Sequence, residues 1–174
     1  MRRGGLAPHD VPAVSAMAGA LRHRGPDGYS IAQEGGIALG QTWLDLTGGT
    51  TGERPLARSA DGRYSLAYDG TLYNTRELRS ALVALGWTAP ASFDAEILLA
   101  LFALRGADCL PMLNGMFAFA VWDGYERELF LVRDRFGQKP LFYALAGDLF
   151  VFASAARPLF LNPELKRAAD HNAL

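Results

Sequence analysis

Three short stretches of the chain hold the residue types from which a chemical site could be built. They are His23–Gly28, Tyr68–Gly70 and Arg133–Pro140. Arginine offers a planar fork for a carboxylate, and glycine lets backbone N–H groups approach a ligand closely. Simpler interpretations remain open for the first two: a helix-stopping turn in which Asp27 bonds its own backbone, and a tight hairpin turn at Asp69-Gly70.

The third stretch, Arg133–Pro140, has a simpler interpretation too. Asp134 would pair with Arg133, Arg135 or Lys139 in a charged turn, and exposed pairs of this kind contribute only about 0–1 kcal/mol. Patterns for other chemistries are missing from the sequence. No two cysteines or histidines have metal-ligand spacing, and neither a G-x-x-x-x-G-K-[ST] loop nor a G-x-S-x-G elbow occurs. We therefore predict no metal site.

The size and charge of the chain narrow the class of protein. It has 174 residues, with 17 basic and 18 acidic side chains. This length predicts one compact domain, and a net charge near zero gives no reason to expect nucleic acid or an anionic membrane as partner. The apolar stretches are too short to span a bilayer, and no secretory signal opens the chain. The lone Cys109 fits a reducing compartment, so a cytoplasmic domain is expected.

The elements that must position these stretches follow from hydrophobic periodicity. Helices are expected after Asp10, after Thr75, from Ser92 or Phe93 to Gly106, and around Asp108–Leu113. The glycine- and threonine-rich segment Thr47–Gly52 predicts a flexible surface loop. The predicted strands are Tyr29–Gln33, Ile37–Leu46, Arg63–Tyr68, Met116–Trp122, Glu128–Arg133, Pro140–Leu145 and Leu149–Ala153. Early strands, central helices and late strands predict antiparallel sheets layered with helices, an α+β fold.

Four motifs together resemble a known family. They are His23–Gly28 (H-R-G-P-D-G), Tyr64–Asn74 (Y-S-L-A-Y-D-G-T-L-Y-N), Leu113–Phe119 (L-N-G-M-F-A-F) and Arg133–Tyr143. In this order and spacing they are similar to the class II glutamine amidotransferase domain of asparagine synthetases. The resemblance implies a four-layer αββα sandwich of the N-terminal-nucleophile hydrolase type. It places this domain at residues 1–162, and a linker toward a synthetase domain, or a C-terminal tail, at 163–174.

The resemblance also implies a chemistry. In the family an N-terminal cysteine attacks the side-chain amide of glutamine, with its own α-amine as base. An Asn side chain and a Gly backbone N–H form the oxyanion hole, an Arg holds the substrate carboxylate and an Asp its amine. Ammonia then moves to a synthetase domain that adenylates a carboxylate. ATP and magnesium would belong to that synthetase, so no cofactor is expected in this chain.

Several of the family's site positions carry other residues here. The carboxylate-binding Arg falls at Trp43, which offers one N–H and no charge. The oxyanion-hole Asn falls at Asp69, which accepts hydrogen bonds when ionised and repels a developing oxyanion. Gly70 and Asp94, the expected amine-binding residue, are kept, and Thr71 replaces an acidic residue. Arg24, in the first motif, completes the candidate substrate-binding set.

The nucleophile has no counterpart in the sequence. The family begins M-C-G-I-A-G on its first strand, whereas this chain begins Met1-Arg2-Arg3-Gly4. The nucleophile and the first strand are therefore interpreted as missing, and no catalytic residue is predicted. Cys109 lies in a segment typical of the family's core and cannot take over. A sheet without that strand has an unpaired edge, which predicts a partner chain or a homodimer.

Three functions remain as hypotheses. The first is an amidotransferase domain of an asparagine-synthetase-like, ATP-dependent amide-forming ligase, degenerate and unable to hydrolyse glutamine. The second is a non-catalytic domain or subunit that supports a separate synthetase using free ammonia or another amine, such as an amide-forming cyclase. The third is a sensor with an amino-acid ligand near Asp94. The synthetase signature S-G-G-x-D-S does not occur, so a synthetase partner, fused or separate, is expected.

Overall fold

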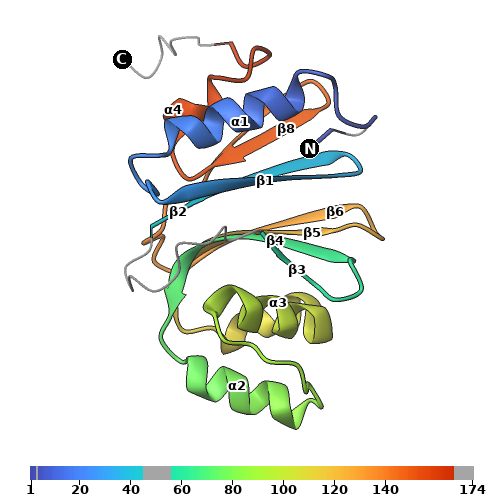
Figure 1. The fold of residues 1–174 in the computed structure, drawn as a ribbon, viewed down its shortest axis with the longest axis vertical. Helices are drawn as coiled ribbons and strands as arrows, with labels where there is room; N and C mark the ends of the chain where they lie inside the picture. Colours follow the sequence, from blue (N-terminus) through green and yellow to red (C-terminus); the bar gives the residue numbers. More distant parts are fainter. Residues whose placement is uncertain (3, 45–55, 167–174) are drawn as a thin grey trace. The chain divides into compact units, whose positions relative to one another are not determined.

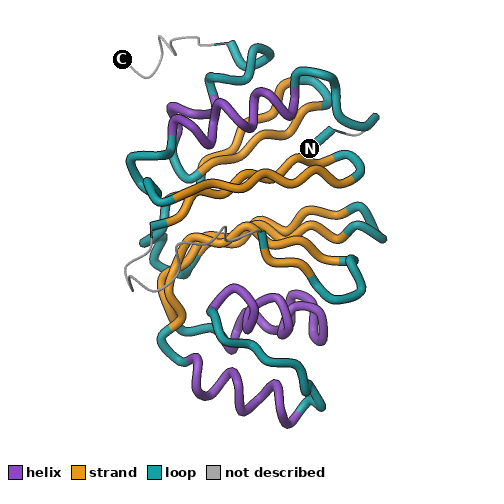
Figure 2. The backbone as a smooth tube through the Cα atoms, in the orientation of Figure 1, coloured by secondary structure: helices purple, strands orange, loops and turns teal. Residues whose placement is uncertain are grey.

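The computed structural model describes residues 1–2, 4–44 and 56–166. The chain divides into two compact units. The first unit is Met1–Arg54 with Leu141–Leu174, and the second unit is Pro55–Pro140. Each unit combines antiparallel sheet with helices (Figures 1 and 2). Among the helices in these described ranges, none has the length and apolar character needed to cross a membrane.

The second unit is built on a four-stranded antiparallel sheet in the order β3-β4-β5-β6. Its helices cover one face of this sheet (Figure 1). The strands are β3 (Ala57–Arg58), β4 (Tyr64–Leu72), β5 (Gly115–Asp123) and β6 (Glu128–Arg133), and the helices are α2 (Thr75–Ala84), α3 (Asp94–Arg105) and the 3-10 helix η1 (Gly106–Met112).

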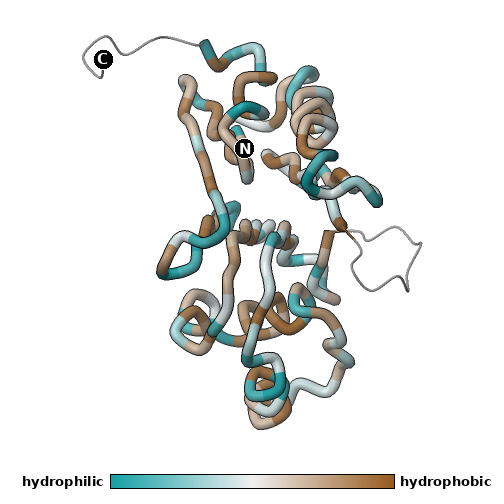
Figure 3. Tube along the Cα trace, turned by 90° about the vertical axis from the view of Figure 1, so that its left-hand side faces the viewer, coloured by the Kyte–Doolittle hydropathy of each residue, from teal (hydrophilic) through white to brown (hydrophobic). Residues whose placement is uncertain are grey.

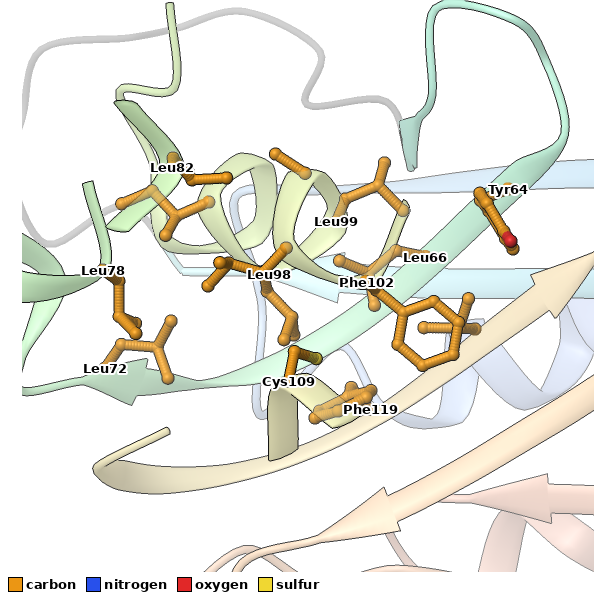
Figure 4. Close-up of a cluster of buried hydrophobic side chains, with 14 of the residues drawn as sticks. Tyr64, Leu66, Leu72, Leu78, Leu82, Leu98, Leu99, Phe102, Cys109 and Phe119 are labelled. Atoms are coloured by element: carbon orange, nitrogen blue, oxygen red, sulfur yellow. The ribbon is translucent and has the colours of Figure 1, made fainter. Parts of the chain in front are cut away.

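Helix α3 supplies much of the core of the second unit. The six consecutive residues Ile97–Phe102 are all buried, because α3 is covered by the sheet on one side and by α2 and η1 on others. The Phe102 ring makes edge contacts with Tyr64 and Phe130, at centroid distances of 5.7 and 5.1 Å. Figure 4 shows Leu98, Phe102 and Cys109 in this cluster, and Figure 3 shows the apolar stretches of the helices.

In its described residues, the first unit contains two two-stranded antiparallel sheets and two helices. Its smaller buried cluster joins Met17 of the first helix to Leu149, Val151 and Leu159 near the end of the described chain. The elements are α1 (Asp10–Ala20), β1 (Gly28–Glu34), β2 (Ile37–Trp43), β7 (Phe142–Ala146), β8 (Leu149–Ala153) and α4 (Ala156–Leu159).

Met1 and Arg2 lie beside β8 in the first unit. The Phe150 N–H donates to the Met1 carbonyl at 2.9 Å, and Arg2 forms an antiparallel bridge with Leu149. The Arg2 N–H donates to the carbonyl of Gly36, in the β1–β2 turn, also at 2.9 Å. The backbones of Met1 and Arg2 thus bond to β8 and to the β1–β2 turn.

Several predicted boundaries are wrong. The tight turn predicted at Asp69-Gly70 is absent from the described chain, because both residues pair with β5 inside the nine-residue strand β4. The strand expected at Ile37–Leu46 ends at Trp43 in the described residues. The short elements β3 and α4 have no counterpart among the predicted elements. The segment Thr47–Gly52 lies outside the described residues.

Two helices begin one residue earlier than expected: Asp10 and Thr75, which should precede α1 and α2, are their first residues. Asp10 is the first residue of α1 and makes no capping bond there; its carboxylate bonds Arg2 and the Ala7 N–H. Helix α2 is preceded by Asn74, whose side chain bonds the Met112 carbonyl and the Asn114 N–H. The side chains of Asp10 and Asn74 thus bond other parts of the chain and do not cap the helices.

Candidate functional site

Asp69 and Gly70 lie side by side on β4, where β4 pairs closely with β5. Asp69 is opposite Ala118 and Gly70 is opposite Phe117. A Cβ atom on Gly70 would lie 2.4 Å from the Met116 carbonyl oxygen and 2.8 Å from the Phe117 Cα. Because both obstacles are backbone atoms, only glycine fits at this point of the sheet. The retained Gly70 therefore has a packing role independent of any ligand.

The loop after β6 is wrapped around the buried carboxylate of Asp134. One carboxylate oxygen accepts the N–H groups of Phe136 and Gln138, each at 3.0 Å, and the other accepts Lys139 N–H at 3.0 Å and Phe117 N–H at 3.3 Å. Burial acts to raise the pKa of Asp134, but these backbone donors outweigh it and lower the pKa to about 2. Asp134 is therefore ionised and fixes the loop to β5.

Arg133 holds the same loop from the other side. Its Nε donates to the Lys139 carbonyl and its Nη2 to the Gly137 carbonyl, both at 2.6 Å. The interpretation of Asp134 as the partner of a neighbouring basic side chain is thus wrong. The two charged side chains instead satisfy backbone groups of the turn that follows them, as a tight loop without regular structure requires.

The ammonium of Lys139 reaches Asp69. Lys139 Nζ donates to Asp69 Oδ1 at 2.7 Å, with the side chains 24 % and 37 % exposed. At the position where the family resemblance places an oxyanion-hole Asn, the structure therefore has a carboxylate with a cationic partner. The pair is partly shielded from water, which strengthens it relative to a fully exposed pair.

Asp94, the first residue of α3, lies close to the same strand. Its Oδ2 accepts the N–H of Leu72 at 2.8 Å, two residues beyond Gly70 on β4. Burial and the nearby carboxylates of Asp94 and Asp69 raise the pKa of Tyr68 on β4, so its hydroxyl stays protonated at neutral pH. The second unit thus brings together two predicted site carboxylates, a phenol and the Lys139 ammonium.

The other predicted site residues, Arg24 and Trp43, lie in the first unit. The loop after α1 folds back with Arg24 N–H and Gly25 N–H both donating to the Leu21 carbonyl. It meets the end of β2, where Asp27 N–H donates to the Trp43 carbonyl at 3.2 Å. The H-R-G-P-D-G motif is therefore a helix-stopping turn attached to the strand that carries Trp43.

The Trp43 ring covers a glycine of this loop. A Cβ on Gly28 would fall 2.2 Å from the indole Cζ2, and a Cβ on Gly25 only 2.5 Å from the Trp43 backbone nitrogen. Gly28 thus leaves room for the Trp43 ring, where the resemblance expects an arginine, and Gly25 allows the close approach of the β2 backbone. The indole packs against Gly28 as an apolar filler.

Comparisons with known proteins agree with the family resemblance of the motifs that form this site. The model of a family described as the glutamine amidotransferase domain matches residues 4–174. The chain belongs to the glutamine amidotransferase domain family. It is 37 % identical over 162 residues to asparagine synthetase [glutamine-hydrolyzing] 3 of Bacillus subtilis, covering 92 % of this chain and 26 % of that protein. A putative asparagine synthetase [glutamine-hydrolyzing] of Mycobacterium bovis is 37 % identical over 186 residues, covering 98 % of this chain and 28 % of that protein.

A solved structure shares the fold of the amidotransferase domain. It is the glutamine phosphoribosylpyrophosphate amidotransferase of Bacillus subtilis, at a TM-score of 0.67 and 24 % identity, covering 86 % of this chain and 40 % of that chain. With the antiparallel sheets, this likeness confirms the predicted α+β fold of the N-terminal-nucleophile type. The amidotransferase domain spans about a quarter of the length of the synthetase relatives it matches.

Cys109 of the amidotransferase domain is enclosed by the core. Its side chain is fully buried in η1, next to Leu98 and Phe119 in Figure 4. Burial raises the pKa of the thiol to about 11. A protonated, inaccessible thiol is a poor nucleophile, so Cys109 has the character of a packing residue.

One cluster of potential metal-ligating groups lies among the described residues. Ligand atoms of His9, Asp10 and Glu164 fall within 4.8 Å of one another. The Arg2 guanidinium already donates to both carboxylates, and His9 Nε2 is 2.7 Å from Glu164. The donor set is therefore engaged in an ion-pair network, and its chemistry fits charge neutralisation better than metal binding.

Two residues of this site, Asp134 and Lys139, are outside the predicted set of site residues, although their stretch, Arg133–Pro140, is one of the three that could build a chemical site. Spacing along the chain could not reveal that the ammonium of Lys139 reaches a residue 70 positions earlier. The available signal was an unusual acidic residue at Asp69, since a partly buried carboxylate usually has a cationic partner.

Proposed function

We propose that this chain is the amidotransferase domain of an asparagine-synthetase-like, ATP-dependent amide-forming ligase and that it does not hydrolyse glutamine. The observation that carries this proposal is the carboxylate of Asp69 at the expected oxyanion position. Hydrolysis of an amide builds negative charge on the carbonyl oxygen, and a catalyst must present N–H donors there. A carboxylate presents acceptors and a negative charge instead.

The change at Asp69 is expected to lower the rate of glutamine hydrolysis strongly. Removing a single oxyanion donor typically lowers the rate by about a hundred- to a thousand-fold. Replacing the donor by an acceptor adds electrostatic repulsion to that loss. Lys139 offsets only part of this repulsion.

Trp43, in the first unit, supports the same conclusion. An arginine there would bind the glutamine carboxylate through two parallel N–H···O bonds. The indole has one N–H and no positive charge, and its ring lies against Gly28. Losing a bidentate charged contact weakens both binding and orientation of an amino acid.

The role left for such a domain is non-catalytic support of a synthetase, either fused or as a separate subunit. The synthetase would take free ammonia or another amine as its nitrogen donor and would itself bind ATP and magnesium. The relatives named asparagine synthetases extend well beyond the matched part, at 26–28 % coverage of their lengths. Such a length leaves room for the partner that this role requires.

An assay of glutamine hydrolysis tests the proposal. The polypeptide purified from its own source is incubated with glutamine, and glutamate and ammonia are measured, with the Bacillus subtilis asparagine synthetase as positive control. We expect no release above background, in the wild type and in the variant with Trp43→Arg alone. Stoichiometric glutamate and ammonia from the wild type would overturn the proposal.

A further inference from the structure

Lys139 is held in place by its backbone before its side chain makes any contact. Its N–H donates to Asp134 and its carbonyl accepts from Arg133. The following Pro140 restricts the backbone of Lys139 to extended conformations. The direction in which the lysine side chain leaves the loop is therefore set by the loop and not by Asp69.

Asp69 is connected to the same loop through the paired strands β4 and β5. Its neighbour Gly70 is opposite Phe117 in the β4–β5 register. Phe117 in turn makes two bonds with Asp134: its carbonyl accepts the Asp134 N–H at 2.8 Å, and its N–H donates to the carboxylate at 3.3 Å. A closed ring of contacts thus runs from Asp69 through the strands to Lys139 and back across the ion pair. Such preorganisation lowers the entropic cost of forming the pair.

We propose that Lys139 is a specificity-determining residue that closes the oxyanion position by pairing with Asp69, and that breaking the pair turns this position into a site for an anionic group. This inference rests on the proposed function, because it explains how the altered position is kept neutral. In the intact pair the carboxylate neutralises the ammonium and occupies one of its N–H donors. An anion or an amide oxygen approaching the pair would have to displace Asp69.

The composition of the chain allows a direct measurement of this pair. Lys139 and Lys166 are its two lysines. Nuclear magnetic resonance of the chain labelled with ¹⁵N at lysine Nζ therefore gives at most two ammonium signals, and Lys166, which is exposed, is an internal control. We expect the Lys139 signal to resist exchange with water in the wild type. In Asp69→Asn it should shift and broaden, while the Lys166 signal stays unchanged.

Inorganic phosphate then probes the opened position. In Asp69→Asn, phosphate should bind saturably and restore a sharp Lys139 signal, with an affinity at least about tenfold higher than in the wild type. The matched variant Asp69→Asn/Lys139→Met should lose this binding, and Lys166→Met should not change it. Asp69→Ser is a second variant that removes the charge if Asp69→Asn does not fold, as judged by circular dichroism.

Two results would overturn the inference: a Lys139 signal that is the same in the wild type and in the Asp69 variants, or equal phosphate binding by all of them. Neither result depends on glutamine turnover. Ammonia release by the wild type would remove the proposed function while leaving the ion pair measurable. An unpaired Lys139 in an inactive protein would remove only this inference.

Discussion

Two carboxylates of the second unit, Asp134 and Asp69, hold the same lysine in different ways. Asp134 binds the backbone N–H of Lys139 and three further N–H groups, and its side chain is buried. Asp69 binds the end of the lysine side chain, and it is 37 % exposed. Both contacts belong to the loop that follows β6.

The difference shows that the fold depends on Asp134 and that it tolerates other residues at position 69. Without Asp134, several backbone N–H groups would lose their acceptor in a place that water reaches poorly, which is costly. Without Asp69, the Lys139 ammonium would lose one acceptor, which water or an anion can replace because the pair is partly exposed. The family motif around Asp134 is therefore tied to folding, whereas the residue at position 69 can vary and alter the chemistry of the site.

The largest expected effect comes from removing the Asp134 carboxylate. Asp134→Ala leaves four N–H donors without their acceptor, and we expect the midpoint of thermal unfolding to fall by about 5–10 °C. Asp134→Asn keeps one acceptor oxygen and should lose less. The measurement is calorimetry, with exposed Asp108→Ala as control. Equal midpoints for Asp134→Ala and Asp108→Ala would show that the loop does not depend on this carboxylate.

The pH dependence of stability should carry a signature of Asp134. Its pKa is lowered from the ordinary 3.8 to about 2, so the folded state favours the ionised form. This contribution is complete above pH 3.8 and is lost as the pH falls toward 2. Between these values, denaturant unfolding of the wild type should lose stability more steeply than that of Asp134→Asn. Parallel curves for the two proteins would contradict the assignment.

The smallest expected effect comes from breaking the partly exposed ion pair of Asp69 and Lys139. Asp69→Asn and Lys139→Met should each shift the unfolding midpoint by no more than about 2–4 °C, because partly exposed ion pairs contribute roughly 0–1 kcal/mol. The double variant tests whether the two changes are coupled. Shifts as large as that of Asp134→Ala would mean that the pair, and not the backbone wrapping, holds the loop.

Much of the fold could be predicted from the sequence, and particular residues explain the misses. Hydrophobic periodicity predicted a helix from Ser92 or Phe93 to Gly106, and the structure has α3 there. The continuous burial of Ile97–Phe102 comes from the elements packed around the helix. Asp69-Gly70 predicted a turn, yet the strand passes through it. The local preference of Asp-Gly for a turn was overridden by pairing with Phe117 and Ala118, which lie about 50 residues later in the chain.

The sequence likewise predicted part of the candidate site and could not predict the rest. The motifs by themselves determined the family, and with it the positions of Trp43, Asp69, Gly70 and Asp94, because motif order and spacing are properties of the chain. The tertiary structure alone decided that Asp134 binds backbone, that Trp43 rests on Gly28 and that Lys139 reaches Asp69. Such contacts join residues far apart in the sequence, and they depend on strand register and loop geometry. Neither is encoded in local residue preferences.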